Sequence, residues 1–474
     1  MELIEEIIDD ESYRDAIATV DESGNRIWIY ARKPKGWYHR QRVIVAVILL
    51  TVFFATPLIW VNGHPLFLFN LFERKFIILG NVFAPQDFHL LALAMITFFV
   101  FIILFTVVFG RVWCGWACPQ TVFMEMVFRK IEYWIEGDAN QQRKLNAQPW
   151  NTQKMLKKGS KQLIFVSIAI LIAHTTLAYL IGIDQTLKLI SNPPDENLYG
   201  FLGLLLFTFI FYGVFAYFRE QACIAVCPYG RLQGVLLGKD SMSVTYDFER
   251  GEPRGKLKSK DTYKEQLKTQ GDCIDCKLCV QVCPTGIDIR NGTQLECVNC
   301  TACIDACDQV MEKIQKPSGL IRYASYNNII KKTKFKFTPR IIAYSVVLTL
   351  LIGLDVFLLT NRGQIETTIL RERGSLPIKM ENGDISNIYS VQVTNKTFED
   401  LPIRFVLKGT PGKIQMAGGD MIAVKNTTTE GGFFVVIPAS ELNTLKNSIQ
   451  IEVWSGKELK ETVTTNFLGP IKIK

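Results

Sequence analysis

The chain has 474 residues, of which 48% are hydrophobic, and its mean hydropathy is +0.16. This length allows two or three domains, and the hydropathy excludes a soluble protein whose apolar residues are spread evenly, so we expect membrane spans. The net charge of +8 decides little until the basic residues are placed along the chain. The twelve cysteines exclude a disulfide-stapled secreted domain, because all lie in four short clusters ending at Cys307, an arrangement typical of metal ligands.

Five apolar stretches are long enough to cross a bilayer, which takes about 20 residues. None of them contains lysine or arginine, whereas a buried core helix rarely runs this long without a charge. We predict spans at Val43–Val61, Phe88–Phe109, Leu163–Ile183, Phe201–Phe218 and Ile341–Thr360.

The basic residues of the connecting segments predict the orientation. Lysine and arginine together number seven in 1–42, two in 62–87, nine in 110–161, one in 183–199 and twenty in 219–340. Because basic residues are enriched in cytoplasmic loops, the first, third and fifth of these segments are predicted to be cytoplasmic. The odd number of spans then places the C-terminal segment on the periplasmic side of a bacterial inner membrane. The first span is expected to act as an uncleaved anchor, since the residues before it are charged and polar.

Two short cysteine motifs follow the second and fourth spans. Cys114-Gly-Trp-Ala-Cys118-Pro and Cys223-Ile-Ala-Val-Cys227-Pro each begin five residues after a span that runs inward. On a helix, residues i and i+4 share a face, and the proline limits the helix there, so the four thiols could meet. Three interpretations stay open: buried structural cysteines, a third iron–sulfur centre, or a soft-metal site, since thiolates select Cu(I).

A second cysteine pattern lies before the fifth span. Cys-x2-Cys-x2-Cys-x3-Cys occurs twice, from Cys273 to Cys283 and from Cys297 to Cys307, which is the bacterial two-cluster ferredoxin pattern. Two-residue gaps let three thiolates turn toward one cube, whereas the fourth reaches the other. The predicted ligands are Cys273, Cys276, Cys279 and Cys307 for one [4Fe–4S] cluster, and Cys283, Cys297, Cys300 and Cys303 for the other. Zinc prefers ligand pairs separated by longer gaps.

The C-terminal segment is predicted to be an all-β sandwich. Alternating or β-branched runs separated by turn residues occur at Ile388–Val393, Ile403–Leu407, Met421–Val424, Phe433–Ile437 and Ile449–Trp454. The predicted fold is therefore mixed: five membrane helices, an inserted two-cluster ferredoxin-like α+β domain and a C-terminal β-sandwich. The predicted segments are 1–42 (cytoplasmic), 43–239 (four-helix membrane region), 240–339 (cytoplasmic ferredoxin-like domain), 340–360 (fifth helix) and 361–474 (periplasmic domain).

Three stretches resemble the cytochrome oxidase accessory proteins of the CcoG/FixG/RdxA family. They are Gly110–Gln120, Arg219–Gln233, and Tyr246-Asp followed by Arg250-Gly-Glu-Pro-Arg254. The ferredoxin pattern and the five-span layout extend the resemblance to nearly the whole chain. Quinol-dehydrogenase subunits of nitrate and nitrous oxide respiration share the cysteine motifs, but the Arg250–Arg254 stretch and the β tail favour the oxidase accessory family.

The resemblance implies an immunoglobulin-like tail and a role in assembling a cbb-type haem–copper oxidase. Proteins of this kind are thought to reduce Cu(II) to Cu(I), so copper is the expected substrate. The expected partners of the protein are oxidase subunits or copper chaperones, a cytoplasmic electron donor and the lipid bilayer. No nucleic-acid partner is expected, because the basic patch Lys331–Arg340 is typical of anchoring at the inner membrane face.

The hypothesis is that electrons enter two [4Fe–4S] clusters and pass to copper near Cys114, Cys118, Cys223 and Cys227, the candidate catalytic residues. A quinol dehydrogenase that sends electrons the other way and a non-enzymatic assembly scaffold are the alternatives. The Arg250–Arg254 stretch leaves two interpretations open, a solvated loop and a docking surface for a partner.

Overall fold

The computed structural model describes residues 19–469, apart from 22, 62, 72–74, 79–80, 84–86, 257–269, 333–337, 362, 398, 426 and 443. The start of the predicted cytoplasmic N-terminal segment, part of the predicted ferredoxin-like domain and the centre of the basic patch before the fifth span therefore lie outside the described residues. The chain divides into two compact units, residues 1–58 with 95–351, and residues 59–94 with 352–474.

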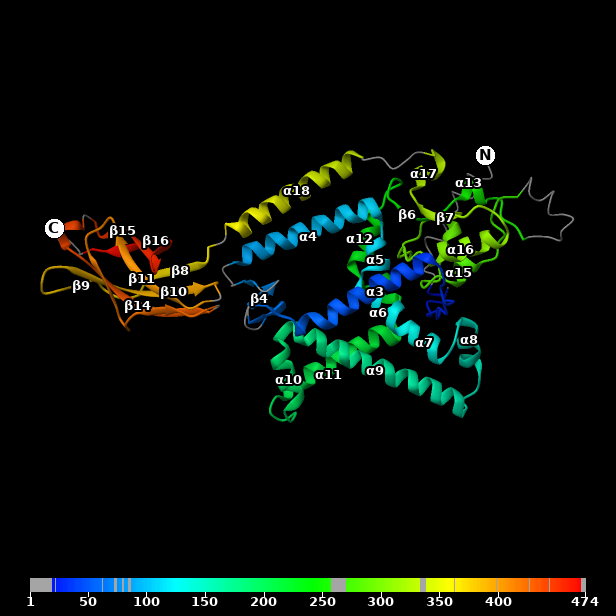
Figure 1. Ribbon diagram of the computed structural model, residues 1–474, viewed down its shortest axis with the longest axis horizontal. Coiled ribbons are helices and arrows are strands. Elements are labelled where there is room, and N and C mark those ends of the chain that lie inside the picture. Colours follow the sequence, from blue (N-terminus) through cyan, green and yellow to red (C-terminus); the bar gives the residue numbers. More distant parts are fainter. Residues whose placement is uncertain are drawn as a thin grey trace. The chain divides into compact units, whose positions relative to one another are not determined.

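Five helices of the described chain are long and apolar enough to cross a membrane, as predicted. In Figure 1 they are α3 (Trp37–Ala55), α4 (Phe88–Phe109), α9 (Thr152–Ile181), α11 (Leu198–Gly213, extended by the π-helical turn η4, Val214–Phe218) and α18 (Pro339–Thr360). The largest difference from the predicted bounds is in α9, which begins at Thr152 rather than Leu163. The Asn151 side chain caps this helix by accepting a hydrogen bond of 2.8 Å from Lys154 N, so the helix starts in a polar segment that hydropathy does not detect.

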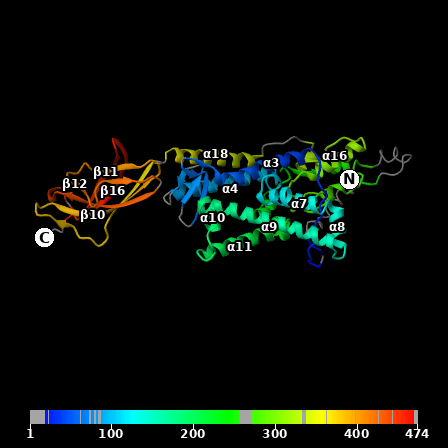
Figure 2. The same cartoon turned by 60° about the horizontal axis from the view of Figure 1, so that its bottom comes forward.

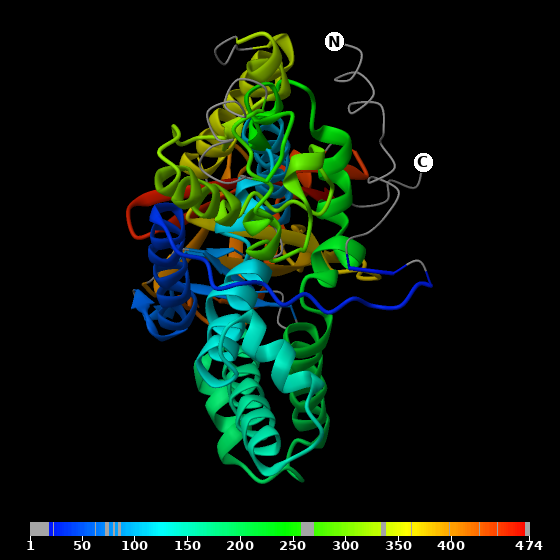
Figure 3. The same cartoon turned by 90° about the vertical axis from the view of Figure 1, so that its right-hand side faces the viewer.

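Helices α9 and α11 lie side by side, and α10 (Ile183–Ser191) packs on α9 beside them (Figures 2 and 3). The Phe128 ring packs between α9 and η4: its centroid lies 4.8 Å from that of Phe165, edge to face, and 4.9 Å from that of Phe215, stacked. The remaining helices between the spans are α5 (Val112–Trp116), α6 (Pro119–Phe123), α7 (Arg129–Ile135), α8 (Ala139–Ala147) and α12 (Pro228–Leu236).

Three π-helical turns occur next to the two cysteine motifs. They are η3 (Met124–Phe128) after the first motif, and η4 and η5 (Ala222–Val226) before and within the second. Such turns are rare and are found frequently at functional sites. Their position shows that the regular helix is interrupted where the cysteines lie.

The ferredoxin-like domain is built on one strand pair and short helices. Strands β6 (Ser243–Tyr246) and β7 (Ile321–Ala324) pair antiparallel, with Val244 opposite Tyr323. The helical elements are α13 (Phe248–Gly251), α15 (Leu278–Gln281), η6 (Ile289–Asn291), α16 (Ala302–Lys313) and α17 (Tyr326–Ile330). Six of the eight predicted cluster ligands belong to the core of these elements, whereas Cys300 packs in a neighbouring cluster and Cys276 is exposed.

The second unit contains a sandwich of two antiparallel sheets. One sheet has the order β12-β14-β10-β8, with β9 paired to β10, and the other has the order β13-β11-β15-β16. The strands are β8 (Ile365–Arg371), β9 (Ile378–Lys379), β10 (Ile385–Asn395), β11 (Leu401–Lys408), β12 (Lys413–Met416), β13 (Met421–Ala423), β14 (Thr428–Ile437), β15 (Lys446–Ser455) and β16 (Glu458–Leu468). Alternate side chains such as Val391, Val393, Phe433 and Val435 are fully buried between the sheets.

The five predicted runs all lie in strands of this sandwich, but β8, β9, β12 and β16 were not predicted. Strand β16 is mostly Glu, Lys and Thr, so its apolar alternation is weak although it pairs with β15 along its length. The unit also includes small strands before α4 that the sequence did not predict: β1 (Trp60–Val61), β2 (His64–Pro65), β3 (Phe67–Asn70), β4 (Lys75–Ile78) and β5 (Asn81–Phe83). A buried ion pair of 2.7 Å between Lys396 and Asp87 joins this segment to the sandwich.

Candidate functional site

Each predicted set of cluster ligands lines one cavity of the ferredoxin-like domain. A cavity of about 20 Å³ is bordered by Cys273, Cys276, Cys279 and Cys307, here called the first cysteine group. A second cavity of about 20 Å³ is bordered by Cys283, Cys297, Cys300 and Cys303, here called the second cysteine group, with Cys279 also on its wall. The other wall residues are largely apolar, Ile287 and Ile289 among them. Four thiols around an apolar hollow fit a [4Fe–4S] cube, which is held by four thiolates; ligation itself stays a prediction.

The two halves of the ferredoxin pattern share an unusual backbone conformation. Asp275 and Lys277 flank Cys276 with φ values of 48° and 54°, and Asn299 and Thr301 flank Cys300 with φ values of 52° and 65°. Non-glycine residues rarely adopt this left-handed conformation, and it persists where the surrounding structure demands it. In both halves the short helix α15 or α16 follows directly. The repeat in the sequence is therefore a repeat in the backbone.

Burial controls the protonation of these thiols. It raises the pKa of Cys279 and Cys297 to about 12 and that of Cys300 to about 11. Without a bound group these thiols are therefore protonated at neutral pH. Because the thiolate is the metal ligand, cluster binding must displace these protons.

The Arg250–Arg254 stretch braces the first cysteine group. Its backbone pairs with the segment around Cys273: Cys273 N donates to Gly251 O at 3.3 Å, and Asp272 N donates to Arg250 O at 3.0 Å. The Arg250 side chain donates to the Asp272 carboxylate at 2.5 Å and to the Ser318 carbonyl at 2.9 Å. This stretch is thus tied into the domain rather than being a solvated loop, and it positions the first predicted ligand.

Replacing Gly271 by alanine is expected to remove about half of the cluster iron. A Cβ at this position would lie 2.4 Å from the carbonyl carbon and oxygen of Gly251, which are backbone atoms of the brace. Overpacking of this kind typically costs about 1–3 kcal/mol, and here it would displace Cys273. Iron and acid-labile sulfide per chain should be measured after anaerobic purification. Gly238→Ala is the control, because nothing lies within 4 Å of its added Cβ; full iron content in Gly271→Ala would contradict the expectation.

The two membrane-edge motifs share a conformation that differs from the predicted one. In each, the second cysteine lies outside the preceding helix in an extended conformation, with φ −62° and ψ 126° at Cys118 and φ −69° and ψ 113° at Cys227. The following prolines, Pro119 and Pro228, begin α6 and α12 at the position where the missing N–H costs nothing. The prediction that one helix carries both cysteines and ends at the proline is therefore wrong.

The four thiols of these motifs, here called the thiol quartet, nevertheless lie within electrostatic range of one another. Burial, together with Cys118 and Cys227 and opposed by a hydrogen bond from Gln233, raises the pKa of Cys114 to about 11. Burial and the other three thiols raise the pKa of Cys223 to about 12. The structure thus places all four candidate catalytic residues within electrostatic range of one another.

The quartet is not shaped around a single ion. Among the residues that the structure describes, no three His, Cys, Asp or Glu side chains are arranged to hold one metal ion. The two cysteine groups of the ferredoxin-like domain likewise do not converge on one point, because their thiols surround cavities.

Gly115 of the first motif packs directly on the loop of the second cysteine group. A Cβ on Gly115 would lie 2.4 Å from the carbonyl oxygen of Val298 and 3.0 Å from the carbonyl carbon of Asn299. Asn299 is held in turn, because its Oδ1 accepts from Val244 N at 3.2 Å and its carbonyl accepts from the Tyr323 hydroxyl at 3.3 Å. The backbone between Cys297 and Cys300 is therefore in contact with the backbone between Cys114 and Cys118.

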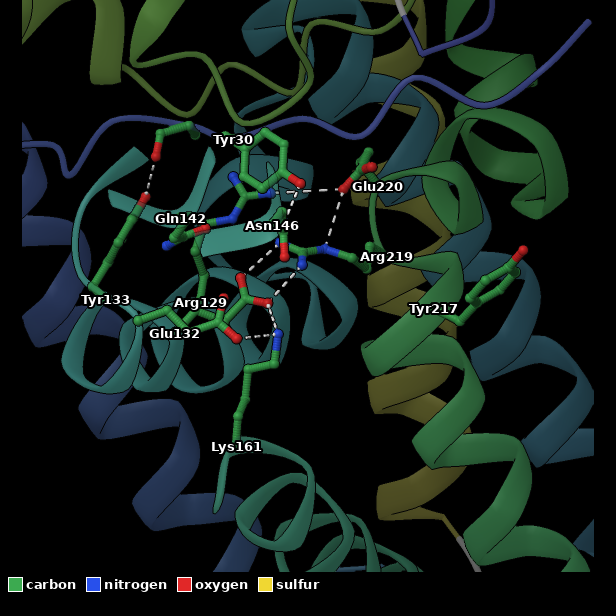
Figure 4. A network of polar contacts seen from close by, with 12 residues as sticks. Tyr30, Arg129, Glu132, Tyr133, Gln142, Asn146, Lys161, Tyr217, Arg219 and Glu220 are labelled. Carbon is green, nitrogen blue, oxygen red and sulfur yellow. Dashed lines mark hydrogen bonds and ion pairs between the residues drawn. The ribbon is translucent and has the colours of Figure 1, made fainter. Parts of the chain in front are cut away.

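A buried network of ion pairs supports the second motif (Figure 4). Arg219 donates to both carboxylate oxygens of Glu132, at 2.8 and 3.0 Å, and Lys161 lies 3.5 Å from the same carboxylate. Glu220 lies 3.6 Å from Arg129, and all of these side chains are buried. Arg219 has φ 54°, which is uncommon outside glycine, at the point where the chain reverses between η4 and η5. The network thus holds the turn that leads into Cys223.

Four functional residues were not assigned a role from the sequence. Gln233 has no exposed surface, and its amide donates to the Cys114 sulfur at 3.2 Å. Arg42 and Arg111 are buried beside the contact between the first motif and the ferredoxin-like domain, and Glu132 is buried in the ion network. Basic residues near spans are usually counted as anchors facing the headgroups, so only the folded chain distinguishes these two arginines.

Three parts of the chain match models of known families. Residues 218–326 match the 4Fe-4S dicluster domain, residues 91–137 match the 4Fe-4S binding domain, and residues 356–470 match the IG-like fold at the C-terminal of FixG. The first two models cover the two cysteine groups and the thiol quartet. They show that this is a membrane iron–sulfur protein of the electron-transfer type.

Relatives of the chain are similar over most of its length. It is 32% identical over 435 residues to the nitrogen fixation protein FixG of Rhizobium meliloti (strain 1021), which covers 82% of this chain and 81% of that protein. Protein RdxB of Cereibacter sphaeroides is 34% identical over 78% of this chain and 80% of its own length. Protein RdxA of the same organism is 33% identical over 81% of this chain and 83% of its own length.

A crystal structure of a FixG-related protein from Vibrio parahaemolyticus aligns with 23% of this chain and 100% of that chain, at 17% identity and a TM-score of 0.20. The family follows from the sequence relatives and from the match of the C-terminal domain, which agree with the resemblance of the cysteine motifs. The chain therefore belongs to the FixG/RdxA family of membrane iron–sulfur proteins.

Proposed function

We propose that this protein takes electrons from a cytoplasmic donor and reduces Cu(II) to Cu(I) at the thiol quartet, for the assembly of a cbb-type oxidase. The contact of Gly115 with the loop of the second cysteine group carries this proposal. It brings the predicted electron-carrying domain against the motif that would hold the substrate. Each Cu(II) ion gains one electron, and the donor loses one.

The proposed orientation follows from the basic residues of the loops. The ferredoxin-like domain and the quartet are proposed to face the cytoplasm of a bacterial cell, and the immunoglobulin-like domain the periplasm. Reducing conditions in the cytoplasm suit twelve free cysteines. A donor from that side could approach the first cysteine group, since Cys276 is exposed.

The residues of the chain have separable tasks in this proposal. Two [4Fe–4S] clusters, when bound by the two cysteine groups, supply one-electron carriers. The quartet binds copper through soft thiolate ligands, which favour Cu(I) and so make Cu(II) easier to reduce. Gln233 donates to the Cys114 sulfur, and the backbone N–H groups of Gln120 and Thr121 bond to Cys118 and oppose the rise of its pKa by burial. These donors stabilise the thiolates against the cost of burial.

The direct test is the reduction of Cu(II) by the full-length protein in detergent under anaerobic conditions. The protein is reduced, desalted and mixed with Cu(II), and Cu(I) is counted with a chelating dye. Cys118→Ala and Cys227→Ala are expected to lose most of the reduction while keeping their iron. Val226→Ala is the matched control, because this side chain lies in the same motif and is 67% exposed. Unchanged reduction in both cysteine variants would remove the quartet from the mechanism.

A third [4Fe–4S] cluster is the second candidate for the quartet, favoured by the match of residues 91–137 to a 4Fe-4S binding domain. Iron analysis with EPR distinguishes the two occupants. Two clusters contribute about eight irons per chain, and a third raises the number to about twelve. The Cys118→Ala variant should lower the iron content only if the quartet holds a cluster.

A further inference from the structure

We infer that Arg42 and Arg111 are the counter-charges of the second cysteine group, and that they make its cluster the better electron acceptor of the two. Electrons would then run from the first group, near the domain surface, toward the membrane edge. This inference deepens the proposed function by giving the transfer a direction, and its test needs no copper.

Both arginines are buried without an acidic partner. Arg42 is 3% exposed and Arg111 is 5% exposed. Within the described part of the chain, no carboxylate lies within ion-pair distance of either guanidinium, whereas the buried Arg129 and Arg219 both have such partners. The Arg42 Nη2 and the Arg111 Nε also have no hydrogen-bond acceptor among the described residues.

Their remaining contacts place them on either side of the junction between the first motif and the ferredoxin-like domain. Arg42 Nε donates to Gly115 O at 2.6 Å. Arg111 donates to Gly230 O at 2.7 Å, and its other terminal nitrogen donates to the Leu295 carbonyl. Arg111 therefore bridges the first motif, the helix after the second motif and the loop that precedes Cys297.

Each arginine also interacts electrostatically with the second cysteine group. Arg111 lies within electrostatic range of the Cys297 sulfur, as well as of Cys114 of the quartet. Arg42 lies within electrostatic range of the Cys300 sulfur. The two cations thus act on two different predicted ligands of one cluster.

A buried cation without an acidic partner is costly, because burial removes its hydration and hydrogen bonds to neutral carbonyls return only part of the lost energy. A [4Fe–4S] cube with four thiolates is itself anionic and gains one more negative charge on reduction. Its presence would pair both arginines. The pairing is stronger in the reduced state, so the two cations favour reduction and raise the potential of the cluster.

Among the described residues, the first cysteine group has no buried cation without an acidic partner. Arg290 borders its cavity, but this guanidinium is paired with Asp275 at 2.6 Å and with Asp288 at 2.5 Å. Lys277 also borders the cavity, but it is exposed, so solvent screens its charge. Asp272 is likewise matched by Lys316 at 3.0 Å. The charges around this cavity therefore largely cancel.

Two acidic residues near the second group do not reverse this difference. Glu125 interacts with Cys300 but is itself paired with Arg129 at 3.1 Å. Glu296 interacts with Arg111 from a half-buried position, and the described residues show no ion pair between the two. A partly solvated carboxylate at longer range offsets only part of a fully buried cation.

The test is an EPR-monitored redox titration of the anaerobically purified full-length protein without copper. The wild type is expected to show two one-electron waves. Arg111→Gln and Arg42→Gln should each shift the more positive wave to lower potential and leave the other in place. A tenfold loss in the equilibrium constant for reduction corresponds to about 59 mV for a one-electron couple, and we expect at least that shift. Arg111→Lys keeps the positive charge, so the potential of the more positive wave should stay close to that of the wild type.

A reciprocal variant and an exposed control identify the waves. Asp288→Asn leaves Arg290 less neutralised, so it should raise the more negative wave and narrow the gap. Arg143→Gln, on the exposed face of α8, should move neither wave.

Unchanged waves in Arg111→Gln and Arg42→Gln, or equal shifts of both waves, would overturn the inference. Loss of iron in both Arg111→Gln and Arg111→Lys would overturn it for Arg111, because packing rather than charge would then be responsible. Failure of copper reduction alone, with the wave shifts as expected, would reject the proposed function and leave this inference standing.

Discussion

Replacing Gly115 by alanine is expected to slow the reduction of Cu(II) by about 100-fold, the penalty that a 1 Å misplacement of reacting groups can cause. The added Cβ would lie 2.4 Å from the carbonyl oxygen of Val298, an atom of the backbone that Asn299 holds in place. The loop and the first motif must therefore move apart. The ferredoxin-like domain should keep its iron, because Val244 and Tyr323 hold the loop at Asn299 and the first motif therefore moves instead. Stopped-flow mixing of reduced protein with Cu(II), together with iron analysis, measures both quantities.

Gly159 offers the matched control for this change. It lies in α9, and nothing lies within 4 Å of a Cβ added there. Gly159→Ala should leave the rate unchanged and should stabilise the helix slightly, by up to about 1 kcal/mol. A normal rate in Gly115→Ala, with full iron content, would show that the backbone contact is not the place where the domain meets its acceptor.

Replacing Glu132 by glutamine is expected to destabilise the membrane-edge region by about 3–5 kcal/mol, the usual cost of removing one partner from a buried ion pair. Arg219, which donates to both oxygens of Glu132, would keep its charge in a buried site, and Lys161 would lose one of its partners. Because Arg219 holds the turn into Cys223, copper reduction should fall together with stability. Thermal unfolding in detergent, followed with a thiol-reactive dye, measures the first effect.

The pH dependence of this variant follows from the pKa of Glu132. Burial disfavours the charged carboxylate, but Arg219 and Lys161 outweigh burial and lower the pKa below its ordinary value of 4.5. The ion pair therefore contributes fully at neutral pH, and its contribution is lost only as the pH falls below about 4.5 through the lowered pKa. The wild type and Glu132→Gln should differ most at neutral pH and converge in acid. Lys332→Gln, which breaks an exposed pair with Glu249, should cost less than about 1 kcal/mol at any pH; a similar loss in both variants would contradict the role of burial.

The ferredoxin pattern and the five spans could be predicted from the sequence because both depend on local spacing. Two-residue gaps between cysteines decide which thiols can turn to one side, and the structure lines its two cavities with the two predicted sets. The spans follow from runs of about 20 apolar residues. Strand β16 was missed because its stability comes from pairing with β15 rather than from its own apolar alternation.

The thiol quartet could be predicted only in part from the sequence. That its four cysteines could meet was predicted, but the extended conformation of Cys118 and Cys227 was not, because a proline after a cysteine is equally compatible with ending one helix or beginning another. Contacts with neighbouring segments decide which of the two the proline does. Gln233 and Arg219 were within the recognised stretches, yet their roles depend on Cys114 and Glu132, which lie far away in the chain.

The sequence by itself determined which residues could carry electrons and how many helices could cross a membrane, since ligand spacing and hydropathy are properties of short segments. Only the tertiary structure decided that Gly115 meets the loop after Cys297, and that Arg42 and Arg111 are buried at this junction with no acidic partner in the described part of the chain. Such contacts join residues widely separated in the chain, and their energy comes from burial and charge in the assembled fold. No local pattern records them.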